Sequence, residues 1–104
     1  MNLVVADAPG RQRYEALLDD VLVGVLTYAV KNGRIALIHT EVMPAHEGRG
    51  IGAALTRFAL DDARRRELLV IASCPYVKRY LETHLDDLDI VVGWSPPDTE
   101  AGAS

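Results

Sequence analysis

Three glycines at alternate positions, Gly48, Gly50 and Gly52, constrain the fold of this chain more than any other feature. They follow an apolar run and precede apolar residues spaced as on one face of a helix, so they predict a strand, a tight turn and a helix. Glycines here let successive backbone N–H groups point into one concavity with no side chain in the way. A concavity of this kind at a helix N-terminus is suited to binding a pyrophosphate.

The spacing of these glycines differs from that of two common phosphate-binding motifs. No Gly-Lys-Ser/Thr follows them, as it does in the P-loop, and the pattern is not the G-x-G-x-x-G of dinucleotide-binding folds. Arg49 could supply a cation to the phosphates or be a solvated loop residue, and the sequence favours both interpretations equally. We therefore expect another phosphate-bearing cofactor, bound by residues Glu47, Gly48, Arg49, Gly50, Ile51 and Gly52.

Strands are expected before the glycine turn. Residues 21–30 and 34–42 are rich in β-branched side chains and flank Asn32-Gly33, the dipeptide favoured in type I′ turns. They therefore predict a hairpin. A shorter strand is expected over residues 13–18, after a short apolar run at residues 3–6 and a turn at Pro9-Gly10.

The second half of the chain predicts a helix, a strand, a second helix and a last strand. The first helix begins at Ile51, and the apolar run 68–72 predicts a strand covered on both faces, at the centre of the sheet. Pro75, which follows Ser73-Cys74, predicts the start of the second helix. We expect its inner face to carry Val77, Leu81 and His84, and the last strand to span residues 90–94.

Length and composition are typical of one globular domain. The chain has 104 residues, of which 49% are hydrophobic and 25% charged. We expect the domain to span residues 1–94 and the polar, Pro-containing residues 95–104 to be a disordered tail. No apolar run approaches the roughly 20 residues of a membrane helix, and the N-terminus lacks a basic leader, so we expect a cytoplasmic protein.

Charge and the potential ligand residues argue against several partners. The formal net charge of −4 argues against nucleic acid. The lone Cys74 permits no internal disulfide and no thiolate cluster for zinc. The histidines, at positions 39, 46 and 84, lack metal-ligand spacing. We therefore expect no metal, no nucleic acid and no membrane partner.

Residues 47–52 resemble the central motif of the GNAT superfamily of acetyl-CoA-dependent N-acyltransferases, Arg/Gln-x-x-Gly-x-Gly/Ala, with Glu47 in place of the Arg or Gln. The chain is more similar still to the small, single-domain YjdJ-type branch of that family. In this branch a His-Thr-Glu-Val strand, the glycine loop and a Cys-Pro-Tyr-Val segment recur in that order, here at 39–42, 47–52 and 74–77. The resemblance covers residues 12–94 or so.

The resemblance implies an α/β fold, the minimal acyl-CoA N-acyltransferase fold, with a mixed, mostly antiparallel, splayed sheet and two main helices. The sheet would open between the strand that ends near Met43 and the strand that ends near Ser73. The pantetheine arm of acetyl-CoA, the implied co-substrate, would lie in this split. Backbone groups of Val42 and Met43 would bind its amides.

Acetyl transfer to an amine needs a neutral amine, a stabilised oxyanion and a proton for the departing thiolate. Glu41 is the candidate base if its carboxylate is partly buried on the strand edge, because burial favours the protonated form. An exposed, solvated Glu41 is the ordinary alternative. The backbone N–H of Val42 or Met43 is the candidate oxyanion donor. His39 is a weaker candidate base.

Cys74 has three candidate roles. A thiol at a helix N-terminus ionises readily, so it could protonate the leaving thiolate or accept the acyl group itself. It could also be a buried small hydrophobe. Tyr76 and Tyr80 are rival proton donors. We expect direct transfer, with Cys74 or a tyrosine as the acid.

Two functions agree with this pattern. The first is an acetyl-CoA-dependent N-acetyltransferase whose amine acceptor is a small molecule, a peptide or a protein. Only a tight turn separates the strand ending at Leu18 from the strand beginning at Val21, so the acceptor side should be open. The alternative is a coenzyme A-binding regulatory or scaffolding module. The sequence leaves the acceptor and the oligomeric state open.

Overall fold

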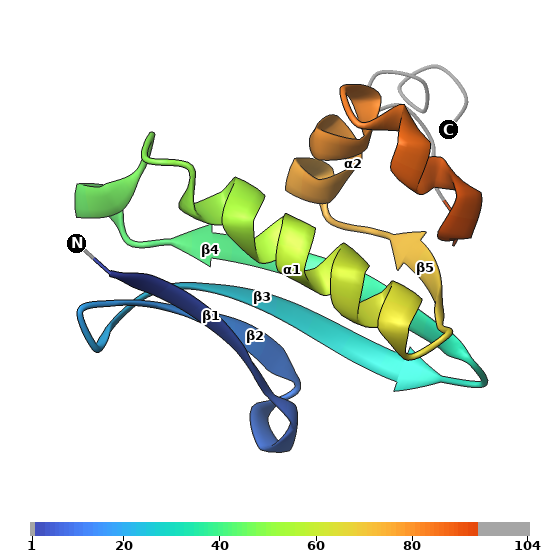
Figure 1. Cartoon of the computed structure of the whole chain (residues 1–104), viewed down its shortest axis with the longest axis horizontal. Coiled ribbons are helices and arrows are strands. Elements are labelled where there is room, and N and C mark those ends of the chain that lie inside the picture. The colour runs from blue at the N-terminus through green and yellow to red at the C-terminus, as the bar shows by residue number, and fades with distance from the viewer. Residues whose placement is uncertain (1, 94–104) are drawn as a thin grey trace.

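The structure, a computed structural model, describes residues 2–93 (Figure 1). It is a mixed, mostly antiparallel six-stranded sheet with helices, as expected from the sequence. The strands, in the order in which they lie side by side, are β1 (Leu3–Ala8), β2 (Arg13–Leu18), β3 (Val21–Lys31), β4 (Arg34–Val42), β5 (Leu69–Ala72) and β6 (Val91–Gly93). The described helices are α1 (Ile51–Arg65), α2 (Pro75–Glu82) and the 3-10 segments η1 (Pro9–Arg11), η2 (Pro44–His46) and η3 (Leu85–Ile90).

The hairpin predicted at Asn32-Gly33 is confirmed. Both residues have positive φ, 54° and 77°, as a type I′ turn requires. The turn joins β3 to β4, and Lys31 pairs with Arg34 next to it. Local backbone chemistry was therefore sufficient to predict this pairing.

The sheet opens between β4 and β5. β1 to β4 pair antiparallel, whereas β5 runs parallel to β4 and pairs only from Arg34–Leu69 to Leu37–Ala72. β4 continues to Val42 without a β5 partner. The Leu37 carbonyl accepts hydrogen bonds from the N–H groups of Ser73 and Cys74, at 3.0 and 2.9 Å, where the two strands part. The predicted split is thus present at the ends of these strands.

The core lies between the sheet and the helices. Figure 1 shows α1 lying across one face of the sheet with α2 beside it. Leu55, Ala59 and Ala63 of α1 are fully buried, whereas Phe58 is half-buried and makes an edge contact with Tyr14. None of the described helices is long and apolar enough to cross a membrane.

Two expectations for the second half of the chain are wrong. β5 is the fifth of six strands rather than central, and Leu69 is 40% exposed while Val70 is buried. Alternate residues are exposed because only one face of this strand is covered. His84 is also exposed, because α2 ends at Glu82 and the helical spacing stops there.

Several predicted boundaries differ slightly from the structure. The apolar run at residues 3–6 is part of a further strand, β1, which extends to Ala8. The Pro9-Gly10 turn is part of η1, and Ile90 belongs to η3 rather than to the last strand. Trp94 and the predicted tail at 95–104 lie outside the described residues.

Candidate functional site

The glycine turn has the geometry of an anion cradle. Gly48 and Gly50 have φ of 81° and 80°, and Arg49 between them is not among the residues with positive φ. When residues alternate between left-handed and right-handed backbone conformations, their successive N–H groups point to the same side. Gly50 is also the N-cap of α1, whose first N–H groups have no acceptor within the helix. The turn therefore presents several backbone donors at the positive end of a helix.

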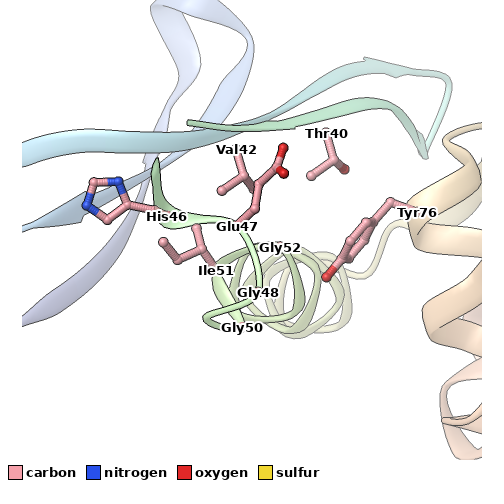
Figure 2. Close-up of a pocket in the computed structure, with 9 residues that line it drawn as sticks. All are labelled: Thr40, Val42, His46, Glu47, Gly48, Gly50, Ile51, Gly52 and Tyr76. Carbon is pink, nitrogen blue, oxygen red and sulfur yellow. The ribbon is translucent and has the colours of Figure 1, made fainter. Parts of the chain in front are cut away.

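This cradle opens onto a cleft between β4 and the helices (Figure 2). The cleft has a volume of about 330 Å³. Six of the eight residues predicted to bind the cofactor line it, and so does Tyr76, a predicted catalytic residue. The lining residues are Thr40, Val42, His46, Glu47, Gly48, Gly50, Ile51, Gly52 and Tyr76.

Arg49 and Met43 do not line the cleft. Arg49 lines a separate hollow with Leu3 and Leu18, at the β1 side of the glycine turn, which favours its interpretation as a loop residue. The Met43 side chain is 51% exposed and lines a different hollow. Its backbone N–H already donates to the Val23 carbonyl at 2.8 Å. The expectation that this N–H could stabilise an oxyanion is therefore wrong.

The backbone N–H of Val42, unlike that of Met43, remains a candidate oxyanion donor. Neighbouring residues of a strand point their N–H groups to opposite sides. Because the Met43 N–H is directed to β3, the Val42 N–H is directed to the other side, towards the split. It is the remaining candidate of the two for an oxyanion donor.

A β-bulge decides which side chains of β4 enter the cleft. Thr27 pairs with His39 and Tyr28 with Leu37, so Ile38 is an extra residue without a partner on β3. Beyond it, Thr40 and Val42 line the cleft, and Glu41 lies on the opposite face of the sheet. Thr40 was not among the site residues predicted from the sequence. Its position two residues before Val42 was the available signal.

Tyr76 packs directly against the first turn of α1. A Cβ built on Gly52 would lie 2.5 Å from Cζ of Tyr76, so only glycine permits this contact. Figure 2 shows the Tyr76 side chain forming one wall of the cleft. Tyr80 is outside the cleft, where its ring stacks on His84 and its hydroxyl accepts a hydrogen bond from Arg57.

Cys74 is buried behind the cleft. It occupies the N-cap position of α2, at the predicted helix start, without a side-chain capping hydrogen bond, and its exposed fraction is only 2%. Its Sγ lies 3.2 Å from Oγ1 of Thr40, and either atom could be the donor. The thiol therefore faces the cleft only through the Thr40 hydroxyl.

Glu41 and His39 lie on the face of the sheet that α1 does not cover. The Glu41 side chain is 74% exposed, so the expectation of partial burial is wrong. The carboxylate faces His39, whose Nε2 lies 3.9 Å from its Oε1. Alternation along β4 places both side chains on this face.

The Glu47 side chain points the other way from that of Glu41. Figure 2 shows its side chain pointing into the cleft towards β4. A carboxylate there adds negative charge near the cradle. The Nδ1 atom of His46, which also lines the cleft, is buried without a hydrogen-bond partner.

Comparison with known proteins agrees with this geometry. The family model of the GCN5-related N-acetyltransferases matches residues 13–90, from β2 to the end of η3. The chain belongs to this family. Acetyl transfer, with acetyl-CoA as co-substrate, is the general activity of GCN5-related N-acetyltransferases.

Individual relatives match to different extents. A GCN5-like protein from Staphylococcus aureus has a TM-score of 0.69 and 26% identity, covering 94% of this chain and 96% of that one. The ribosomal-protein-S18-alanine N-acetyltransferase of Escherichia coli has a TM-score of 0.55 and 16% identity over 58% of this chain and 39% of its own, which shows the shared fold.

Curated relatives match a shorter segment. The NATD1 proteins of Mus musculus and Homo sapiens are 39% identical over 59 residues, which is 56% of this chain. The matched segment covers 54% and 52% of those relatives, so the chain spans about half of their length.

Proposed function

We propose that this GCN5-related N-acetyltransferase binds acetyl-CoA in the cleft and transfers the acetyl group to an amine. One observation carries the proposal: the glycine cradle at the N-terminus of α1 opens into the same cleft that the splayed end of β4 lines. The cradle would hold the pyrophosphate with backbone N–H groups. The Val42 backbone would bind the pantetheine arm and the oxyanion.

The burial of Cys74 supports direct transfer. A thiol with an exposed fraction of 2% cannot receive an acyl group unless the structure opens. Its contact with the Thr40 hydroxyl instead supports a proton path, in which Thr40 protonates the leaving thiolate, Cys74 reprotonates Thr40, and the proton released by the acylated nitrogen restores the Cys74 thiol. Tyr76 is the second candidate acid, because its side chain lines the cleft.

Glu41 is the candidate base, acting from the opposite side of β4. Its carboxylate is accessible to an amine that arrives at the uncovered face of the sheet. A carboxylate in this position would attract the ammonium form and take a proton from it before the amine attacks.

One observation favours a second candidate function, a coenzyme A-binding regulatory or scaffolding module. The candidate base and the cleft lie on opposite faces of the sheet, and Cys74 is buried. A protein that binds coenzyme A without efficient transfer would have the same cradle.

The cradle is tested by Gly50→Val, with Gly33→Val as the matched control. Both glycines have φ near +80° and open space where a Cβ would lie, so both variants carry similar backbone strain. We expect Gly50→Val to lose coenzyme A binding in isothermal titration calorimetry, and Gly33→Val to retain it. Unchanged affinity in a folded Gly50→Val protein would exclude the cradle as the pyrophosphate site.

The two candidate functions are then separated by acetyl-CoA consumption. The transferase hypothesis expects acetyl-CoA loss to accelerate when primary amines are added. The module hypothesis expects tight binding of coenzyme A with a rate of loss that amines leave unchanged.

A further inference from the structure

The Glu47 carboxylate lies in the same cleft as the glycine cradle. Glu47 immediately precedes Gly48, and its backbone N–H donates to the Pro44 carbonyl at 3.3 Å, which ties the start of the glycine turn to η2. The Glu47 side chain lines the cleft, and Figure 2 shows it pointing from the turn towards β4. The cleft therefore holds two groups of opposite character: backbone donors that attract anions, and a carboxylate that repels them.

No lysine or arginine offsets the charge of Glu47 inside the cleft. The residues that line the cleft include neither type, and Arg49 lines the separate hollow near Leu3 and Leu18. Within residues 2–93, none of the ion pairs involves Glu47. The carboxylate therefore acts on a bound ligand without a neighbouring guanidinium or ammonium group to neutralise it.

Coenzyme A and free nucleotides differ in the atoms that would face this carboxylate. In coenzyme A the diphosphate is esterified to the pantetheine arm, which continues with a hydroxyl and amide N–H groups. In ADP the same phosphate ends in a further ionised oxygen. With a diphosphate in the cradle, the atoms that follow it lie on the β4 side, where Glu47 and Val42 line the cleft. A carboxylate there can accept hydrogen bonds from the arm, but it meets an additional negative charge in ADP.

The cradle alone cannot distinguish these ligands. Its backbone N–H groups contact only phosphate oxygens, and a diphosphate is present in both. Discrimination therefore needs a group beyond the cradle. Two like charges several ångströms apart in a partly solvated cleft lower the affinity about tenfold, which is enough to select between ligands that otherwise bind equally.

We propose that Glu47 is a specificity-determining residue of the cofactor site, which selects coenzyme A against free nucleoside diphosphates such as ADP. The inference rests on the proposed function. Glu47 disfavours the complex with ADP by repulsion and favours the complex with coenzyme A by accepting hydrogen bonds from the pantetheine arm. It thus lowers the affinity of the cradle for diphosphates in general and restores it for a ligand that carries the arm.

Calorimetric titration of the full-length protein with coenzyme A and with ADP tests this selection. The measurements are made at pH 8, where an ordinary histidine is neutral, and with a chelator, so that no divalent cation bridges carboxylate and phosphate. Glu47→Gln keeps the shape of the side chain and one acceptor oxygen but removes the charge. We expect this variant to bind ADP about tenfold more tightly than the wild type, and its affinity for coenzyme A to change by less than about threefold.

Two further variants separate repulsion from the contact with the arm. Glu47→Ala removes the acceptor oxygens as well as the charge, so we expect it to bind ADP as Glu47→Gln does and coenzyme A about threefold more weakly than Glu47→Gln. Glu67→Gln is the matched control, because it removes one charge beyond the C-terminal end of α1. We expect Glu67→Gln to leave both affinities unchanged.

The ratio of the affinities for coenzyme A and ADP decides the outcome. An equal ratio in the wild type and Glu47→Gln, or no ADP binding in either at millimolar concentrations, would overturn this proposal, while coenzyme A binding to the wild type would preserve the proposed function. Equal coenzyme A affinities in Glu47→Gln and Glu47→Ala would contradict the contact with the arm. Absence of coenzyme A binding in the wild type and in Glu47→Gln would remove the proposed function, and this inference with it.

Discussion

At the residue scale, a threonine connects the buried cysteine to the cleft. Thr40 enters the cleft only because the bulge at Ile38 changes the face of β4 that the following residues occupy. Its hydroxyl is a donor and an acceptor at once, so it can pass a proton from Cys74 outward. The Thr40 hydroxyl and the Cys74 thiol can therefore act together as a proton path into the cleft.

Replacing Thr40 by valine removes this path and keeps the shape of the side chain. We expect Thr40→Val to lower kcat by tenfold or more, the range for loss of a proton-transfer group, with coenzyme A affinity unchanged. Thr40→Ser should restore most of the turnover. The measurements are steady-state kinetics across pH and calorimetry with coenzyme A.

The cysteine itself supplies a readout that does not depend on turnover. In Thr40→Val, the infrared S–H stretching band of Cys74 should differ from that in the wild type and in Thr40→Ser, because the hydrogen bond to sulfur is lost. If Thr40→Val matched Thr40→Ser in both kcat and S–H band, the proton path would be wrong.

At the element scale, a buried carboxylate holds η3 against α1. Asp87 of η3 is 6% exposed and accepts two hydrogen bonds from Arg57 of α1, at 2.7 and 3.0 Å. Arg64, two turns further along the same face of α1, adds a third at 3.2 Å. The paired guanidinium groups satisfy a charge that would be costly to bury alone.

Stability should depend on pH through this carboxylate. The hydrogen bonds from Arg57 are the main reason that the pKa of Asp87 lies below its usual value. A lowered pKa in the folded state stabilises the fold above the unfolded-state pKa of about 3.9, and this stabilisation is lost as pH falls through the folded-state value. We expect Asp87→Asn to lower the free energy of unfolding by about 2 kcal/mol at pH 7.

Urea denaturation of wild type and Asp87→Asn at pH 7 and near pH 3 measures this difference. The gap in unfolding free energy should shrink at the lower pH, because the unfolded-state carboxyl binds protons there before the folded-state one does. Asp89→Asn is the control, because Asp89 pairs with Arg64 on the exposed surface and its removal should have a much smaller effect. A gap that stays constant between the two pH values would contradict the assignment.

At the scale of the whole molecule, the cleft joins segments that are far apart in the sequence. Its lining comes from β4, the glycine turn, the first turn of α1 and the start of α2. A ligand that contacts all of them stabilises the folded state relative to the unfolded chain. Binding and global stability should therefore change together.

Coenzyme A should raise the thermal midpoint Tm. At a ligand concentration 100 times Kd, the folded state gains about 2.7 kcal/mol. For a domain of about 100 residues this corresponds to an increase of roughly 10–20 °C in Tm. Differential scanning calorimetry measures the shift, and Gly50→Val should show none. An equal shift in Gly50→Val would mean that the stabilisation arises elsewhere.

The amino-acid sequence alone determined the features that depend on neighbouring residues. Asn32-Gly33 predicts its hairpin because both residues tolerate positive φ, and Gly48 and Gly50 predict the turn before α1 for the same reason. The glycine cradle and the strand-to-helix order around it followed from these local preferences. So did the position of Cys74 at the start of α2.

Only the tertiary structure decided which face each side chain occupies. Strand alternation is visible in the sequence, but the bulge at Ile38 changes its phase, and the helices cover one face of the sheet while Glu41 lies on the other. For the same reason β5 is exposed at Leu69, and His84 lies beyond the end of its helix. Coverage and register depend on contacts between residues distant in the chain, and no short window of sequence contains them.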